Sequence, residues 1–159
     1  PTGYHTILYN TSGTNLASCV ISPPLLKTGL PVQGFAADAD TYYYQTKDAR
    51  EAHYLSAFLN APCVDEMIKP HQTRGQWGAR HIHRRPFEVV PIPKFNPEDK
   101  NHLRLAEISR ECHQKVKKLK LEGKSIGFLR GKVRKALVGE LADIDGIVKD
   151  ILAFDKVKE

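Results

Sequence analysis

The segment from His71 to Lys94 gathers the side chains of this sequence that are best suited to chemistry on a polyanion. It holds the only tryptophan and four arginines but a single acidic residue, Glu88. Arginine can pair with phosphate or with the O6 and N7 atoms of guanine, and glutamine can pair with adenine. These residue types therefore predict contact with nucleic acid. The residues of this segment that we expect to bind DNA are Gln72, Arg74, Gln76, Trp77, Arg80, His81, His83, Arg84 and Arg85.

The same segment divides into a loop and its support. Gly75 and Gly78 flank Trp77 and allow the backbone to turn or to approach a ligand closely. Residues 87–90 (FEVV) predict a short buried strand, which ends before two prolines because proline cannot donate to a sheet ladder. A polar loop on a rigid scaffold is a common layout for a binding site, although a solvated surface loop would have the same composition.

The sequence contains no recognisable catalytic constellation. The glycine pair at positions 75 and 78 is too short for a phosphate-binding loop, and no Gly-x-Ser-x-Gly motif is present. His81 and His83 could join Cys63 and His71 as four zinc ligands, but their spacing matches no recognised zinc motif. We therefore expect no catalysis, no metal and no cofactor in this chain. A small nuclease built on the histidines and arginines is the enzymatic alternative.

Length and composition are consistent with a DNA-binding domain. The 159 residues fit one domain, or one domain with an appendage, and 24 Lys and Arg against 18 Asp and Glu give a net charge of +6. Three widely spaced cysteines argue against a disulfide framework and for a reducing compartment, which predicts a cytoplasmic protein. No apolar run reaches the roughly 18 residues of a membrane span, so we expect no membrane partner. The chain begins Pro-Thr-Gly, so we expect a fragment of a longer protein.

Residues 1–95 are predicted to form an α/β (α+β) domain. Residues 4–9 and 16–21 are rich in β-branched and aromatic side chains and flank a turn, which predicts a hairpin. Asp48, with Glu51 three residues later, predicts a helix that ends near Asn60. Tyr42 to Tyr44 could offer stacking faces to bases, although neighbouring tyrosines of a strand usually alternate between core and surface. Further strands are predicted at 32–37 and 41–45, and a further helix at 64–69.

Residues 96–159 are predicted to form an antiparallel helical hairpin. Asn96-Pro97-Glu98-Asp99 has the residues of a helix start, and apolar stripes at 105–119 and 126–151 are separated by Gly123. Nine Lys and Arg and one acid lie between residues 112 and 135. Lys117 and Lys118 are expected to contact DNA phosphates, although a charge run is often only a solvated face. The hairpin could instead dock on a protein partner or form a homodimer.

Three motifs in this chain resemble those of DNA target-recognition domains. They are Tyr54–Asn60 (YLSAFLN), Pro91-Ile92-Pro93 after a basic loop, and Ile144-Asp145 in an apolar terminal helix. Domains of this kind occur in the specificity subunits of type I restriction-modification systems. They also form the C-terminal halves of Taq-type and type IIG adenine methyltransferases. Ala61 departs from the serine that is common in the family.

The resemblance implies a mixed-sheet domain that reads a short sequence in double-stranded DNA. An upstream methyltransferase domain of the same chain would bind S-adenosylmethionine and carry out the reaction. The whole protein would then be a site-specific adenine methyltransferase of a prokaryotic restriction-modification system, with or without endonuclease activity. In that family the Pro-Ile-Pro segment is structural, and the residues that read bases vary between members. A protein-interaction module and a stand-alone nuclease are the alternatives.

Overall fold

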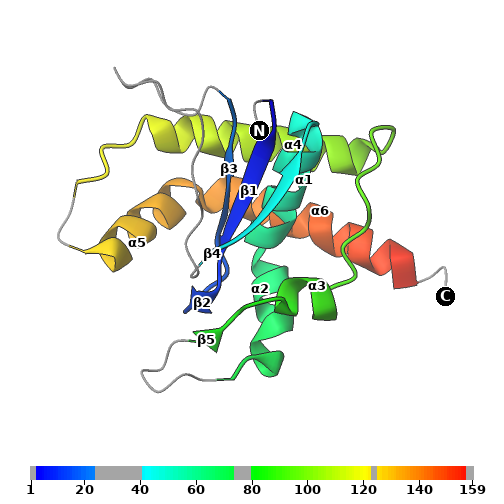
Figure 1. Ribbon diagram of the computed structural model, residues 1–159, viewed down its shortest axis with the longest axis horizontal. Helices are drawn as coiled ribbons and strands as arrows, with labels where there is room; N and C mark the ends of the chain where they lie inside the picture. Colours follow the sequence, from blue (N-terminus) through cyan, green and yellow to red (C-terminus); the bar gives the residue numbers. More distant parts are fainter. Residues whose placement is uncertain (1–2, 24–40, 74–79, 123–124, 157–159) are drawn as a thin grey trace.

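The computed structural model describes residues 3–23, 41–73, 80–122 and 125–156, which form a mixed α+β structure. A three-stranded antiparallel sheet in the order β3-β1-β4 lies against a group of helices (Figure 1). The predicted α+β class is thereby confirmed. The strands of this sheet are β1 (His5–Asn10), β3 (Ser18–Ile21) and β4 (Thr41–Thr46).

The predicted hairpin is confirmed by the pairing of β1 with β3, in which Thr6 lies opposite Ile21 and Tyr9 opposite Ser18. β4, also predicted, pairs with the other edge of β1. Ile7 and Tyr9 are buried on one face of β1, as expected for side chains that alternate along a strand. The strand predicted at 32–37 lies outside the described residues.

The predicted first helix is confirmed as α1 (Ala49–Asn60). The Asp48 side chain caps it by accepting a hydrogen bond from the Arg50 N–H at 2.8 Å. Glu51 does not close a capping box; its carboxylate accepts from the hydroxyl of Thr46 in β4 instead. α1 packs against the sheet and against α4 (Lys100–Lys117), which explains why the helix is buried along most of its length.

Polar side chains tie the end of α1 to its neighbours. Asn60 accepts from the Ser18 N–H at 3.0 Å and donates to the Ser18 carbonyl at 2.9 Å. The predicted second helix follows as α2 (Pro62–Ile68) and continues in a 3-10 turn, η1 (Lys69–His71). Asp65 of α2 is buried and accepts from the Leu16 N–H at 2.7 Å. These bonds join the first helices to the sheet edge.

The strand predicted at 87–90 is wrong, because residues 85–89 form a short helix, α3 (Arg85–Val89). Pro86 suits a first helical turn, where its missing N–H needs no partner, and Arg85 pairs with Glu88 at 2.9 Å across one turn. Three apolar residues within the four positions 87–90 fit a helix as well as a strand, so periodicity alone cannot decide between them.

The predicted start of the third long helix is also displaced. The Asn96 side chain accepts from the Glu98 N–H at 3.0 Å and forms a turn before the helix. Asp99 is the actual cap and accepts from the N–H groups of Asn101 and His102 at 2.8 and 3.2 Å. α4 therefore begins at Lys100, three residues later than a cap at Asn96 would place it.

The single helix predicted over 126–151 is in fact two, α5 (Ile126–Ala136) and α6 (Val138–Lys156). The backbone leaves the helical region at Leu137, where φ is −105° and ψ is 15°. Only α6 packs into the core, through buried residues such as Ile144 and Val148, whereas none of the α5 side chains is buried. The predicted two-helix hairpin is therefore replaced by three helices, of which α4 and α6 contact each other.

The core continues across the predicted boundary at Asn96, since buried residues of α1, α4 and α6 belong to one cluster. The division into two domains is itself still a prediction. Within the described ranges, no helix has the length and apolar character needed to cross a membrane.

Candidate nucleic-acid interface

A short two-stranded ribbon holds one end of the predicted DNA-binding loop. β2 (Ser12–Gly13) pairs antiparallel with β5 (Arg80–His81). The N–H groups of Ile82 and His83 both donate to the Thr11 carbonyl, at 2.8 and 3.1 Å. Ile82 is fully buried, and the histidines on either side of it are exposed. The buried isoleucine therefore anchors a segment whose polar side chains face solvent.

His83 has a left-handed backbone, with φ at +42°. Such a conformation costs a residue other than glycine about 1–2 kcal/mol. Its carbonyl accepts from the Tyr9 hydroxyl at 3.0 Å, and its ring stacks on His81 with centroids 5.3 Å apart and planes 9° apart. The turn at His83 thus presents two parallel imidazoles on the surface and fixes them through the sheet.

The two arginines after this turn differ in how much of their charge is available. Arg85 is exposed and pairs with Glu88 in α3, which neutralises part of its charge. Arg84 is exposed and makes no ion pair with any described residue. Arg84 is therefore the cation of this segment that is most free to bind an anion.

The other end of the loop is also fixed, because the His81 N–H donates to the Thr73 carbonyl at 3.1 Å. Gln72 is half-buried next to this bond and ends η1. Arg74, Gln76 and Trp77 lie outside the described residues, and for Arg80 only the backbone is described. The structure therefore places the predicted residues Gln72, His81, His83, Arg84 and Arg85 around the two ends of the loop.

A second basic element lies on α5. This helix contains four cations and no acid, and none of them forms an ion pair with a described residue. The predicted phosphate contacts Lys117 and Lys118 are exposed at the end of α4, before the connection to α5. Lys132 donates to the Lys120 carbonyl and so holds α5 to that connection. The cations of α5 are Arg130, Lys132, Arg134 and Lys135.

Arg130 brings α5 to the ribbon. One nitrogen of its guanidinium lies 4.0 Å from the position that a Cβ on Gly13 would occupy. Gly13 is the residue that pairs with Arg80 in the ribbon. The Arg130 side chain therefore reaches the ribbon, and α5 lies on the same side of the molecule as β2 and β5 (Figure 1). Sequence reasoning missed Arg130, although it lies in the run of nine cations between 112 and 135.

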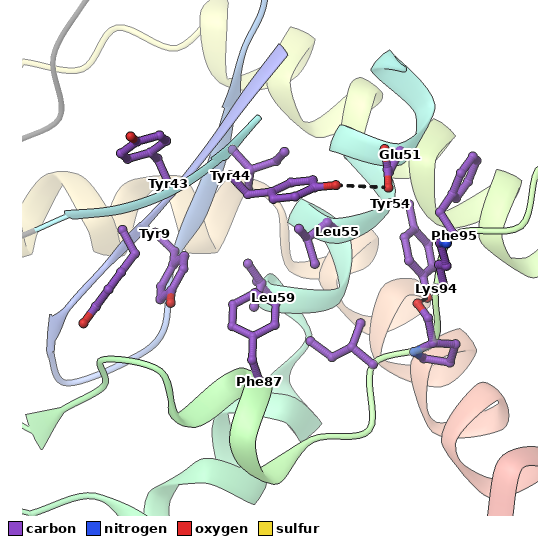
Figure 2. Close-up of a pocket in the computed structure, with 14 residues that line it drawn as sticks. Tyr9, Tyr43, Tyr44, Glu51, Tyr54, Leu55, Leu59, Phe87, Lys94 and Phe95 are labelled. Carbon is purple, nitrogen blue, oxygen red and sulfur yellow. Dashed lines mark hydrogen bonds between the residues drawn. The ribbon is translucent and has the colours of Figure 1, made fainter. Parts of the chain in front are cut away.

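An aromatic pocket of about 420 Å³ adjoins this basic surface. Its walls come from β1, β4, α1, α3 and the segment after α3 (Figure 2). Tyr9 and Tyr42 stack in one wall, with centroids 5.4 Å apart, and Tyr42 meets the edge of His83 at 6.4 Å. The other aromatic residues at the pocket are Tyr43, Tyr44, Tyr54, Phe87 and Phe95, and Glu51 and Lys94 supply its charges.

The zinc ligands considered from the sequence do not assemble in the part of the chain that the structure describes. There, no three His, Cys, Asp or Glu side chains come together as a possible metal site. Cys63 lies beside Asp145 of α6, whose carboxylate accepts from the Cys63 N–H at 2.6 Å. Burial, together with this carboxylate, raises the pKa of the Cys63 thiol to about 12.

Comparison of the chain with protein-family models, curated proteins and solved structures found no match.

Proposed function

We propose that this chain is the sequence-specific DNA-recognition domain of a restriction-modification adenine methyltransferase. It would direct an upstream catalytic domain, which binds S-adenosylmethionine, to a short site in double-stranded DNA. The observation that carries the proposal is that two basic elements border the same ribbon, Arg84 just after β5 and α5 through the approach of Arg130 to Gly13, and that neither forms an ion pair with a described residue. Clustered cations of this kind are the electrostatic footprint of a phosphate-binding surface.

The positions of the three family-like motifs also support the proposal. Asn60, at the end of the first motif, binds the backbone of Ser18 through both atoms of its amide. The carbonyl of Pro93 accepts from the Tyr54 hydroxyl at 2.8 Å, which joins the first motif to the second. Asp145 of the third accepts from the Cys63 N–H at the start of α2. Each motif thus makes a structural contact. This is expected of a domain in which only exposed residues determine the recognised DNA sequence.

The proposed division of labour follows from exposure and charge. Arg84 and the exposed histidines are placed to reach base edges, because they lie on a turn whose backbone is fixed by Tyr9 and Thr11. The lysines at the end of α4 and the cations of α5 are placed to bind phosphates, which gives affinity without sequence preference. Extrusion and methylation of the target adenine would belong to the upstream domain.

The test is selection from a randomised duplex library by the 159-residue chain and by an Arg84→Ala variant. If Arg84 reads a base, its loss removes roughly 1–3 kcal/mol of discrimination at one base pair and leaves other positions unchanged. Arg104→Ala is the matched control, because Arg104 is an exposed arginine that pairs with Glu107 on α4. Equal preferences in all three proteins would show that Arg84 does not read bases.

The phosphate contacts have a separate signature. Replacing Lys117 and Lys118 by glutamine should weaken binding to every sequence alike. It should also reduce the slope of log affinity against log salt by about 0.9 for each phosphate that the variant no longer neutralises. Arg130→Gln should have the same kind of effect if α5 lies on the DNA. Binding that does not change between low and high salt would contradict the proposal.

A second candidate, a protein-interaction module, is favoured by one feature of the same helices. Ile126, Phe128 and Val138 are 70%, 59% and 70% exposed, which is unusual for large apolar side chains on consecutive helices. A homodimer or a complex with the upstream domain could cover them. Sedimentation of wild type and of a Phe128→Ser variant distinguishes self-association, which only the wild type would show.

A further inference from the structure

The aromatic pocket has features of a ligand site, and the proposed DNA-reading surface does not use them. Its volume of about 420 Å³ lies within the range of roughly 300–1,000 Å³ that is usual for small-molecule sites. Two rings in it are substantially open to solvent, since Tyr44 is 46% and Phe87 is 48% exposed. Figure 2 shows these rings on either side of Leu55 and Leu59, which contribute aliphatic surface from α1.

The pocket presents ring faces and a small number of polar groups. The stacked pair of Tyr9 and Tyr42 forms one wall, with their planes 16° apart. Glu51 lies at the rim, where its carboxylate accepts a long hydrogen bond of 3.5 Å from the Tyr44 hydroxyl, and Lys94 adds a donor. A flat ring can stack on such walls and pair its edge with the carboxylate or the ammonium group.

The pocket is also continuous with the basic surface. Tyr9 donates to the His83 carbonyl, Tyr42 meets the His83 ring, and Phe87 lies on α3 two residues after Arg85. A nucleic-acid strand bound at Arg84 would therefore pass the mouth of the pocket. This positive surrounding favours an occupant that carries phosphate over a neutral or cationic peptide.

We propose that the pocket binds a single unpaired base of the DNA held on the basic surface. A duplex exposes only the edges of its bases, because their faces are stacked, so a pocket that offers ring faces can take a base only after it has left the stack. The inference rests on the proposed DNA binding. It adds to it a site, built from Tyr44, Phe87, Tyr9 and Tyr42, for an extruded base other than the target adenine, which the upstream domain would take.

β4 supplies a matched control. Side chains that follow one another in a strand point to opposite faces, so Tyr42 and Tyr44 share the pocket face and Tyr43 does not. Figure 2 shows the Tyr43 ring directed away from the pocket, although this residue borders it. At 62% exposed, Tyr43 is the more accessible of the two neighbours. An effect on binding that requires only an exposed tyrosine would therefore appear in both Tyr43→Ala and Tyr44→Ala.

The experiment compares three duplexes of one sequence: fully paired, with one bulged 2-aminopurine, and with an abasic site at the bulge. We expect the bulged base to raise affinity over the abasic duplex, with quenching of 2-aminopurine fluorescence as it stacks. Tyr44→Ala and Phe87→Ala should each lower affinity for the bulged duplex by roughly five- to a hundredfold. Both should bind the paired duplex like wild type, and Tyr43→Ala should behave like wild type throughout.

The outcomes separate this inference from the proposed function. If the paired duplex binds but the bulged and abasic duplexes bind equally, the base pocket is wrong and DNA recognition stands. Equal losses in the Tyr43 and Tyr44 variants would also overturn the pocket. If no duplex binds, the proposed function fails and the inference falls with it. Circular dichroism melts of each variant establish that a loss of binding does not reflect unfolding.

Discussion

A buried histidine pair should make this protein lose stability between pH 7 and pH 5. His53 of α1 is buried against α4, its Nδ1 lies 3.1 Å from the Ser109 hydroxyl, and its ring meets that of His113 at 5.0 Å. Burial is the main reason that the pKa of His53 falls to about 4, and His113, Arg110, His5 and Lys117 lower it further because all are cationic or can become so.

His113 acts in the same direction. Its Nε2 accepts from the Val20 N–H at 2.9 Å, so Nδ1, which lies 2.7 Å from the Ser109 carbonyl, carries the proton in the folded state. Burial lowers the pKa of His113 as well. A second proton would have to occupy Nε2 and would break the bond to Val20, which ties α4 to β3.

The sign and size of the effect follow from proton linkage. Both imidazoles have a lower pKa when folded than the usual value of about 6.5, so below that pH the unfolded chain binds more protons. The contribution of these histidines to the free energy of unfolding is complete above about pH 6.5. It is lost as the pH falls toward the folded pKa, which for His53 is about 4. At pH 5, His53 alone lowers the free energy of unfolding by about 2 kcal/mol, and His113 lowers it further.

Urea unfolding followed by circular dichroism at several pH values between 7 and 5 measures this loss. Above pH 5 the paired carboxylates are still ionised, so the histidines dominate. A His53→Gln variant should lose about 2 kcal/mol less than wild type over the same interval, whereas His71→Gln, at an exposed histidine, should match wild type. An NMR titration that places the folded His53 pKa near 6.5, or an unchanged pH dependence in His53→Gln, would refute the reasoning.

Three further predictions concern single residues. Asn60→Ala should cost roughly 2–3 kcal/mol in urea unfolding, because it removes both bonds to the Ser18 backbone; a loss below 0.5 kcal/mol, on the order of a surface change, would contradict the anchoring role. Asp48→Ala should cost about 1 kcal/mol through loss of the α1 cap, and Asp48→Asn should recover most of it. Cys63 should react with iodoacetamide at pH 8 much more slowly in the folded chain than in urea, because the pKa of its thiol is raised to about 12. Peptide mapping by mass spectrometry measures the rate, and equal rates in the two conditions would show that the thiol is accessible.

Short sequence patterns predicted the elements whose structure depends on residues close in sequence. The β1–β3 hairpin and the cap of α1 follow from turn residues and from Asp48, and both are present. The helix at 85–89 was missed because three apolar residues within four positions define no period, and Pro86 at its start suits a helix as well as a strand end. The break at Leu137 was missed because both helices continue one apolar stripe, although α6 packs on α4 and no α5 side chain is buried.

The candidate site was predictable by residue type but not by position. The exposed residues His81, His83, Arg84 and Arg85 were singled out from their charge and aromatic character. By contrast, the approach of Arg130 to Gly13 joins segments more than 100 residues apart, and no local pattern contains it. The same holds for the aromatic pocket, since the exposed tyrosines of β4 were visible in the sequence but Phe87 was assigned to a strand. Long-range packing decides both features.

The anchoring bonds indicate which residues could change without changing the fold. Asn60, Asp65 and Asp145 all direct their side chains inward to backbone N–H groups, so their replacement would leave buried donors unpaired. The side chains of Arg84 and of the stacked histidines make no such bonds to described residues, and Ile82 between the histidines is the buried residue of this segment. Substitution at the exposed positions therefore costs little stability, whereas substitution at the anchors costs much. A chain built in this way can vary its exposed residues while the residues that anchor them stay the same.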